Sequence, residues 1–160
     1  MDGVVMYKFC DQNGENISTH DCYATNILYE NGILTFVFAD GIWLTKDHPN
    51  NTTGKTIRTD RAEVQFALEF GTEDDISIYV FKNYFKKTIR EEWKLSKLIE
   101  YANSGKKSLE FLYQYQGFHS VIIECMLWSD RKSYHQECEL KISLKDMKYC
   151  WNKLYEEREW

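Results

Sequence analysis

The chain has 160 residues, a formal net charge of −5 and an isoelectric point of about 5.4. Its hydrophobic content of 43% and charged content of 28% are typical of a globular protein and exclude wholesale disorder. The acidic balance argues against nucleic acid as the main partner, because binding it requires an excess of Lys and Arg on one face. No apolar run approaches the ~20 residues of a membrane helix, and the N-terminal segment lacks the pattern of a signal peptide. We therefore expect one domain, residues 1–160, in the cytoplasm and without a membrane partner.

Aromatic residues and cysteines stand out in the composition. The aromatic content of 16% predicts either a β-rich core or an aromatic-rich recognition surface, because aromatic side chains bury large areas and favour strands. The number of cysteines is odd, and they share no CxxC spacing. We expect reduced thiols, several of them filling the core. The cysteines are Cys10, Cys22, Cys125, Cys138 and Cys150.

The first half of the chain begins as a run of predicted β-hairpins. Asn-Gly or Asp-Gly between two β-prone segments is a strong hairpin signal, since the central residues of the turn need a positive φ. Asn31-Gly32 and Asp40-Gly41 both fit that description. We therefore expect a three-stranded meander over residues 22–45. The expected strands are residues 4–9, 22–30, 33–39 and 42–45.

A polar stretch at 46–55 contains the only proline and predicts a mobile surface loop with a solvated His48. Residues 61–70 follow it and alternate cleanly between apolar and polar side chains, which predicts a half-buried strand. Residues 76–81 predict another strand. The apolar side of the alternating segment consists of Ala62, Val64, Phe66, Leu68 and Phe70.

The second half of the chain contains two predicted helices. Thr88 and Glu91 have the spacing of a capping box ahead of apolar residues at helical spacing, and Gly105 supplies a stop. Ser143 is placed to cap a second helix, whose apolar stripe is Leu144, Met147, Trp151 and Leu154. Between the helices lie predicted strands at 108–116, 118–128 and 134–143. The predicted fold class is α+β: a mainly antiparallel sheet, either curled or a partly open barrel, with two amphipathic helices on one face or at one end.

The cluster Thr19-His20-Asp21-Cys22 combines an imidazole, a carboxylate and a thiol, which is the set that a nucleophile and its base require. In an extended segment His20 and Cys22 would share a face while Asp21 points away. The alternative interpretation is that His20 or Asp21 anchors the turn before the second strand through hydrogen bonds to the backbone. We favour this alternative, and we expect no catalytic residue.

His135, Glu137 and Glu139 share the polar face of the predicted strand at 134–143. Such a row could bind a divalent ion, offer an acidic patch to a basic partner, or simply keep the strand face soluble. Trp128 ends the preceding strand, and an exposed Trp beside carboxylates would be a good interface anchor. The candidate binding residues are therefore His20, Asp21, Cys22, Trp128, His135, Glu137 and Glu139.

No cofactor or metal site is predicted. None of the histidines has the spacing of a zinc site, and no glycine-rich phosphate loop occurs. His119 lies at the end of an apolar strand face, where a histidine is more often a satisfied edge-of-core residue than a catalyst.

Two stretches carry a resemblance to known proteins. HDCYATNILYENGILTFVFADGIWL at 20–44 and WSDRKSYHQECEL at 128–140 resemble segments of small bacterial β-rich proteins. More loosely, they resemble small immunity proteins of bacterial toxin systems. The shared features are a His-Asp-Cys start, turn chemistry and strand alternation, and they imply no catalytic residues.

Three functional hypotheses follow. The first is a non-catalytic binding or inhibitor protein, for example an immunity protein that masks a basic toxin or enzyme with carboxylates and aromatic side chains. The second is a small-molecule-binding cup or barrel, which could be an enzyme with His20 or His119 in its cavity. The third is an assembly component that forms homo-oligomers through an exposed strand edge. We favour the first.

Overall fold

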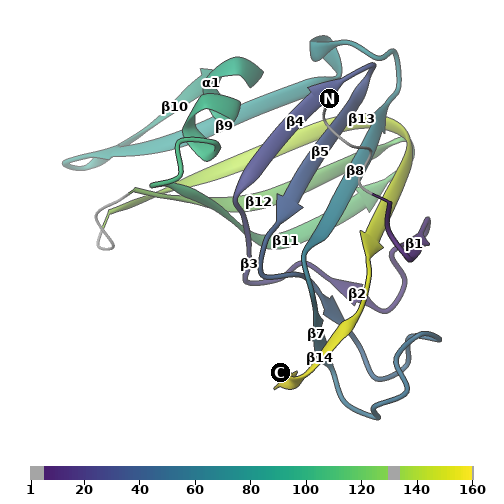
Figure 1. The fold of residues 1–160 in the computed structure, drawn as a ribbon. Coiled ribbons are helices and arrows are strands. Elements are labelled where there is room, and N and C mark those ends of the chain that lie inside the picture. The colour runs from purple at the N-terminus through teal and green to yellow at the C-terminus, as the bar shows by residue number, and fades with distance from the viewer. Residues whose placement is uncertain (1–5, 130–133, 160) are drawn as a thin grey trace.

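A computed structural model describes residues 6–129 and 134–159, and antiparallel strands dominate it (Figure 1). Ten strands form one curled sheet, whose main path runs β3-β11-β12-β13-β8-β5-β4, with β1, β9 and β10 attached at its sides. The ten strands are β1 (Phe9–Asp11), β3 (Cys22–Ala24), β4 (Asn26–Glu30), β5 (Ile33–Phe38), β8 (Ala62–Leu68), β9 (Ile76–Tyr84), β10 (Lys87–Trp93), β11 (Ser108–Gly117), β12 (Ser120–Trp128) and β13 (His135–Trp151).

The long strand β13 organises the sheet. Its first half pairs with β12 on one side and β9 on the other, and its second half pairs with β1 and β8. A register shift between Leu144 and Asp146 separates the halves, and such a bulge bends a strand. The sheet curls without closing into a barrel across the described residues. Its two end strands, β3 and β4, are consecutive in the chain and separated only by Thr25.

The curl brings the inner sides of distant strands together. The ring of Phe111 on β11 lies 5.1 Å from those of Phe36 and Phe38 on β5, in edge-to-face contacts that aromatic pairs prefer. The one α-helix of the described residues, α1 (Leu95–Ala102), adds the buried Leu95, Leu98 and Ala102 to the same core.

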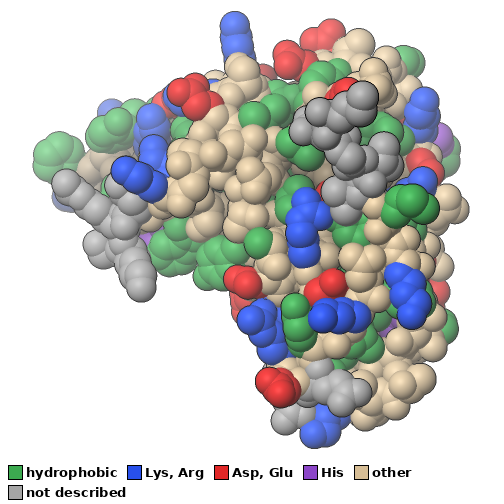
Figure 2. Space-filling model, viewed as in Figure 1, with side chains coloured by type: hydrophobic (Ala, Val, Ile, Leu, Met, Phe, Trp, Pro, Cys, Tyr) green, Lys and Arg blue, Asp and Glu red, His purple; other side chains and the backbone are tan. Residues whose placement is uncertain are grey.

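A second, four-stranded sheet extends the molecule at the end where the C-terminus lies (Figure 1). Figure 2 shows an L-shaped outline, with a recess between this lower block and the projection that carries β9, β10 and β12. The order of the small sheet is β14-β7-β6-β2. Its strands are β2 (Ile17–Ser18), β6 (Trp43–Leu44), β7 (Ile57–Thr59) and β14 (Leu154–Glu159).

The predicted α+β class with two amphipathic helices is wrong, because residues 143–151 belong to β13 and residues 154–159 to β14. The bulge in β13 explains the error. The buried residues alternate with period two up to Leu144, and again from Met147 through Tyr149 to Trp151. The extra residue between the two runs turns this strand pattern into an i, i+3, i+7 series, which is also the signature of an amphipathic helix.

The first predicted helix exists, but it begins later than expected. Thr88 and Glu91 lie in β10, and α1 starts after Lys94, whose side chain makes no capping bond. The apparent capping box is therefore part of a strand. A two-residue match of this kind has low specificity, since Thr and Glu are also common on exposed strands.

The predicted meander at 22–45 is correct only in its first hairpin. β4 and β5 pair across Asn31-Gly32, and both turn residues have positive φ as expected. After Asp40-Gly41 the chain leaves the large sheet, and β6 pairs with β2 and β7.

Several smaller expectations are corrected as well. Phe70 is exposed, because β8 ends at Leu68. His48 is buried rather than solvated. Both of its ring nitrogens have partners: Nε2 donates to Asp11 Oδ2 at 2.8 Å, and Nδ1 accepts from the Asn50 amide. Of the predicted strand at 4–9, residues 4 and 5 lie outside the described residues, and β1 begins at Phe9.

The cysteines are not all reduced thiols as predicted. Cys10 and Cys150, directly opposite each other on β1 and β13, form a disulfide. Cys22, Cys125 and Cys138 are free and buried, so the expectation of core-filling thiols is confirmed for these three. Within the described residues, no helix is long and apolar enough to cross a membrane.

Candidate functional site

The outer side of β9, β12 and β13, away from the core, gathers carboxylates and apolar side chains on one surface. We call this surface the acidic-aromatic face. Residues directly opposite one another in a ladder point to the same side of a sheet, so the strand register defines its membership. Its members are Phe81, Glu124, Met126, Trp128, His135, Glu137 and Glu139.

Trp128 and His135 form one end of this face. They are direct partners across β12 and β13, and their rings lie 4.8 Å apart. Trp128 Nε1 donates to Glu110 Oε2 at 2.7 Å, and Glu110 itself is buried. This hydrogen bond to a charged acceptor fixes the half-buried indole on the sheet.

Three glutamates occupy the middle of the face. Glu124 lies directly opposite Glu139, and Glu137 lies opposite Met126 on one side and Phe81 on the other. The three carboxylate side chains line a hollow of about 310 Å³ together with Phe81, Leu112 and Met126. Like charges directly opposite each other destabilise a ladder, so this arrangement lowers the stability of the free protein.

The described cations nearest to the face lie at its margins. Arg90, opposite Phe81 on β10, packs its guanidinium over the Tyr79 ring at 4.6 Å, and Lys141 follows Glu139 by two residues on β13. Among residues 6–129 and 134–159, no ion pair to Glu124, Glu137 or Glu139 is formed. In the same part of the chain, no group of His, Cys, Asp and Glu is arranged to hold a metal ion.

The cluster at 19–22 has a different geometry from the one predicted. Asp21 has a φ of +56°, so the segment is not extended and the Asp21 carboxylate turns back to lie 3.4 Å from His20 Nε2. His20 Nδ1 donates to the Leu112 carbonyl at 2.5 Å, which ties this turn to β11. The favoured interpretation, a backbone anchor, describes this contact.

Cys22 does not share a face with the His20 ring. Its side chain is fully buried, and its Sγ donates to the carbonyl oxygen of His20 rather than to the imidazole. Burial raises the pKa of the Cys22 thiol to about 12. A thiol that stays protonated and inaccessible near neutral pH is a poor nucleophile.

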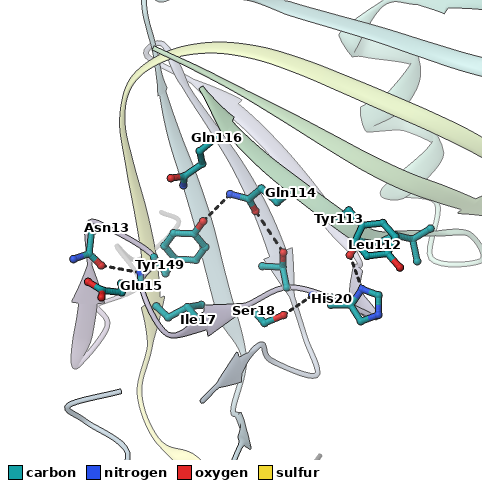
Figure 3. Close-up of a pocket in the computed structure, with 12 residues that line it drawn as sticks. Asn13, Glu15, Ile17, Ser18, His20, Leu112, Tyr113, Gln114, Gln116 and Tyr149 are labelled. Atoms are coloured by element: carbon teal, nitrogen blue, oxygen red, sulfur yellow. Dashed lines mark hydrogen bonds between the residues drawn. The ribbon is translucent and has the colours of Figure 1, made fainter. Parts of the chain in front are cut away.

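His20 also lines a second concavity. We call residues 13–20 the N-terminal arm and this concavity the arm pocket. It lies between residues 13–20 and strands β11 and β13, and its volume is about 760 Å³ (Figure 3). Gln114, Gln116 and Tyr149 form its inner wall, and Gln114 Nε2 donates to the Tyr149 hydroxyl at 2.8 Å. Tyr113 lies between the two sites, because its ring contacts His20 at 5.2 Å and its strand position is opposite Glu124.

The structure thus places the seven predicted residues in three locations. Trp128, His135, Glu137 and Glu139 lie together on the acidic-aromatic face, and His20 lines the arm pocket with Asp21 at its side. Cys22 is buried in the core. The sequence reasoning missed Glu124 and Phe81, although alternation along 118–128 places Glu124 on the same side as Trp128. The remaining signal, the register between β12 and β13, is not visible in a single sequence.

His119, the other histidine considered for a cavity, lies at the β11–β12 turn. Its ring is half exposed and its Nδ1 is 3.1 Å from Glu69 Oε2.

Comparison of the chain with protein families, with characterised proteins and with solved structures finds no significant match.

Proposed function

We propose that this chain is a non-catalytic protein-binding module whose acidic-aromatic face receives a Lys- or Arg-rich segment of a partner protein. The observation that carries the proposal is the pair Glu124 and Glu139, held directly opposite each other beside Glu137 around a hollow that Phe81 and Met126 also line. A ladder that keeps opposed carboxylates loses stability, and an incoming cation would recover it. The methylene stem of Lys or Arg would pack on Phe81 and Met126 while its charged end meets the carboxylates.

The flanking residues support the same occupant. Tryptophan is one of the residue types enriched among the residues that anchor interfaces. The ring of Trp128 is already oriented by its hydrogen bond to Glu110. The formal net charge of −5 would also speed encounter with a basic protein. An immunity or inhibitor protein that masks a basic toxin or enzyme needs these properties and no catalytic group.

The proposal is tested with a triple variant, Glu124→Gln/Glu137→Gln/Glu139→Gln. A matched control, Glu73→Gln/Asp74→Asn/Glu100→Gln, removes three negative charges from exposed positions elsewhere. Binding of a fluorescent oligolysine peptide is followed by anisotropy. We expect the face variant to weaken binding by about ten-fold or more and the control by about two-fold or less, because close charge pairs outweigh screened distant ones. Equal losses in the two variants would reduce the effect to overall charge and would refute a specific face.

The immunity role has its own test. The chain is co-expressed with the product of the neighbouring gene, and survival of the host is scored for the wild type, the face variant and the control. Protection by the wild type and by the control, but not by the face variant, is the expected result. Protection that is unaffected by the face variant would contradict this role for the face.

Homo-oligomerisation would use a different surface. The outer edge of β10 pairs with no strand in the described part of the chain, and a free edge can add a strand from a second copy. The same edge carries Lys87, Arg90 and Glu92, charged side chains of the kind that keep edges apart. We therefore rank this alternative below binding of a basic partner.

A cytoplasmic location belongs to the same proposal, supported by the three free buried thiols. The Cys10–Cys150 disulfide argues against a cytoplasmic location, because cytosolic thiols are kept reduced. Rapid alkylation of cells before lysis, followed by mass spectrometry, reports the state of this pair. A fully oxidised pair in the cell would favour an oxidising compartment instead.

A further inference from the structure

The arm pocket adjoins the acidic-aromatic face at Leu112 and Tyr113, but the rest of its lining comes from other residues and has different chemistry. Residues 13–20 form one wall, and the ends of β11 and β13 form the other (Figure 3). Its volume of about 760 Å³ falls within the roughly 300–1,000 Å³ range of small-molecule sites.

The charge of the lining defines what the pocket can accept. Among the described residues that line it, Glu15 is the only carboxylate and His20 the only imidazole, and none is Lys or Arg. A phosphorylated or acidic ligand would find no fixed cation, and a strongly cationic one would find a single acid. The other polar groups are neutral amides and hydroxyls, which serve as both donors and acceptors. A neutral ligand rich in hydroxyl groups matches this set.

The polar groups of the inner wall are positioned in advance but only weakly satisfied. Gln116 Nε2 and the Tyr149 hydroxyl both donate to Met147 Sδ, at 3.1 and 3.4 Å. A thioether sulfur is a weak acceptor. Ligand hydroxyl oxygens would be stronger acceptors for both groups, so binding would improve these hydrogen bonds.

The wall also resists collapse. Gly14, at a φ of +66°, brings the backbone so close to Tyr149 that an added Cβ would lie 2.7 Å from its ring. The Tyr149 hydroxyl accepts from Gln114 Nε2, and Thr19 Oγ1 donates to Gln114 Oε1 at 3.5 Å. Residues from three distant parts of the chain thus hold one another in place.

An exposed aromatic ring stands at the mouth. Tyr113 lines the pocket, is 54% exposed and contacts the His20 ring at 5.2 Å. A flat aromatic surface beside amide and hydroxyl groups suits a ring that has one apolar C–H face and a polar edge.

We propose that the arm pocket binds a neutral saccharide, with Tyr113 packing on the sugar ring and Gln114, Gln116 and Tyr149 meeting its hydroxyl groups. The pocket gives the small-molecule hypothesis a definite ligand class, and it does not depend on the protein-binding proposal. Loss of one activity therefore leaves the other measurable.

Calorimetric titration of the full chain tests this proposal. The probes are maltotriose, cellotriose and chitotriose, with glucose 6-phosphate as the charged comparator. We expect at least one trisaccharide to bind and the phosphate ester not to bind. Tyr113→Ala and Gln116→Ala should each weaken that binding by about ten-fold, since each removes a direct contact.

Tyr84→Ala is the matched control. Tyr84 is 54% exposed on β9 and does not line the pocket, so its removal should change the affinity by less than about two-fold. Unchanged thermal midpoints exclude misfolding of a variant. Failure of all three trisaccharides to bind would overturn the proposal. Equal losses for Tyr113→Ala and Tyr84→Ala, or equally tight binding of glucose 6-phosphate, would overturn it as well.

Discussion

At the scale of single residues, Gly41 directs the chain from the large sheet into the small one. Its φ of +83° is accessible to glycine at little cost. A Cβ added there would overlap the carbonyl oxygen of Thr59. The neighbouring Ile42 amide donates to Thr59 Oγ1 at 3.0 Å, so this close approach also fixes the crossing.

Gly41→Ala should therefore destabilise the protein by about 3 kcal/mol or more, because it combines backbone strain with a clash against a neighbouring strand. Gly54→Ala is the control: Gly54 has a φ of +75° but nothing within 4 Å of an added Cβ. We expect it to cost only the ~1–2 kcal/mol of a left-handed residue. Urea denaturation of both variants gives the comparison, and equal losses would contradict a steric role for Gly41.

Glu91 is a second residue whose environment has a measurable consequence. Its Oε2 lies 2.7 Å from Lys82 Nζ, and its Oε1 lies 3.1 Å from Lys97 Nζ and accepts from Trp93 Nε1. The hydrogen bonds from Lys82 and Lys97 lower the pKa of Glu91 from 4.5 to about 2. These contacts join the β9–β10 hairpin to α1.

A carboxylate whose pKa is lowered by folding stabilises the protein above its unfolded pKa. That contribution is lost as the pH falls from about 4.5 towards 2. Glu91→Gln should therefore be less stable than the wild type at pH 7, and the difference should shrink towards pH 2. Chemical denaturation at several pH values measures it, with the exposed neighbour variant Glu92→Gln as the control. A difference that stays constant with pH would contradict the assignment.

At the scale of elements, β13 connects the two halves of the large sheet by pairing with β1, β8, β9 and β12. Leu144 pairs with Leu68 and Asp146 with Ala67, so Lys145 is the extra residue of the bulge. The bend lets one strand belong to two differently oriented parts of the sheet. The acidic-aromatic face lies on the half before the bulge, and the wall of the arm pocket, with Met147 and Tyr149, lies on the half after it.

The short strand β1 is held to β13 by the disulfide between Cys10 and Cys150 and by stacking of Phe9 on Trp151. Asp11 of β1 accepts a hydrogen bond from the buried His48, which lies in the loop after β6. β1 in turn carries the start of the arm that walls the pocket.

Replacing both bonded cysteines, Cys10→Ser/Cys150→Ser, should lower the free energy of unfolding by about 2–5 kcal/mol, because the bond closes a loop between residues 140 apart in sequence. Reduced wild-type protein should lose a similar amount. Urea denaturation with and without reductant provides the measurement. Coinciding midpoints for oxidised and reduced wild type would show that the bond contributes nothing.

At the scale of the whole molecule, one continuous core takes side chains from both halves of the curled sheet and from α1. The three free cysteines lie inside it. Burial raises the pKa of Cys22 and of Cys138 to about 12, and raises that of Cys125 well above its ordinary value.

Thiol titration with a chromogenic disulfide reagent reports on this core. We expect no rapidly reacting thiol in the native protein, because the free thiols are both buried and protonated. Denaturation without reductant should expose three thiols, and denaturation after reduction should expose five. A fast thiol in the native state would mean that the core opens locally, and five thiols without reductant would mean that the disulfide is absent.

Local chemistry was sufficient for several parts of this molecule. The Asn31-Gly32 hairpin follows from two residues that tolerate positive φ. The strands predicted at 61–70, 76–81, 108–116, 118–128 and 134–143 correspond to β8, β9, β11, β12 and the first half of β13. The polar side of 135–141 was predictable from alternation, so Glu137, Glu139 and His135 could be placed on one face.

Long-range pairing decided the rest, because its partners are far apart in sequence. The bulge at Lys145 shifts the phase of the buried residues, so a strand acquires the spacing of a helix. The turn at Asp21 is left-handed because its amide donates to Phe111, which is ninety residues away in the chain. Only the β12–β13 register places Glu124 opposite Glu139, and only the curl of the sheet brings residues 13–20 against β11 and β13. By itself, the sequence determined the alternation of inward and outward residues along most strands, though not the exposure of Phe70 or the burial of His48. The tertiary structure decided which residues meet, because strand register and sheet curvature arise from contacts that no local pattern records.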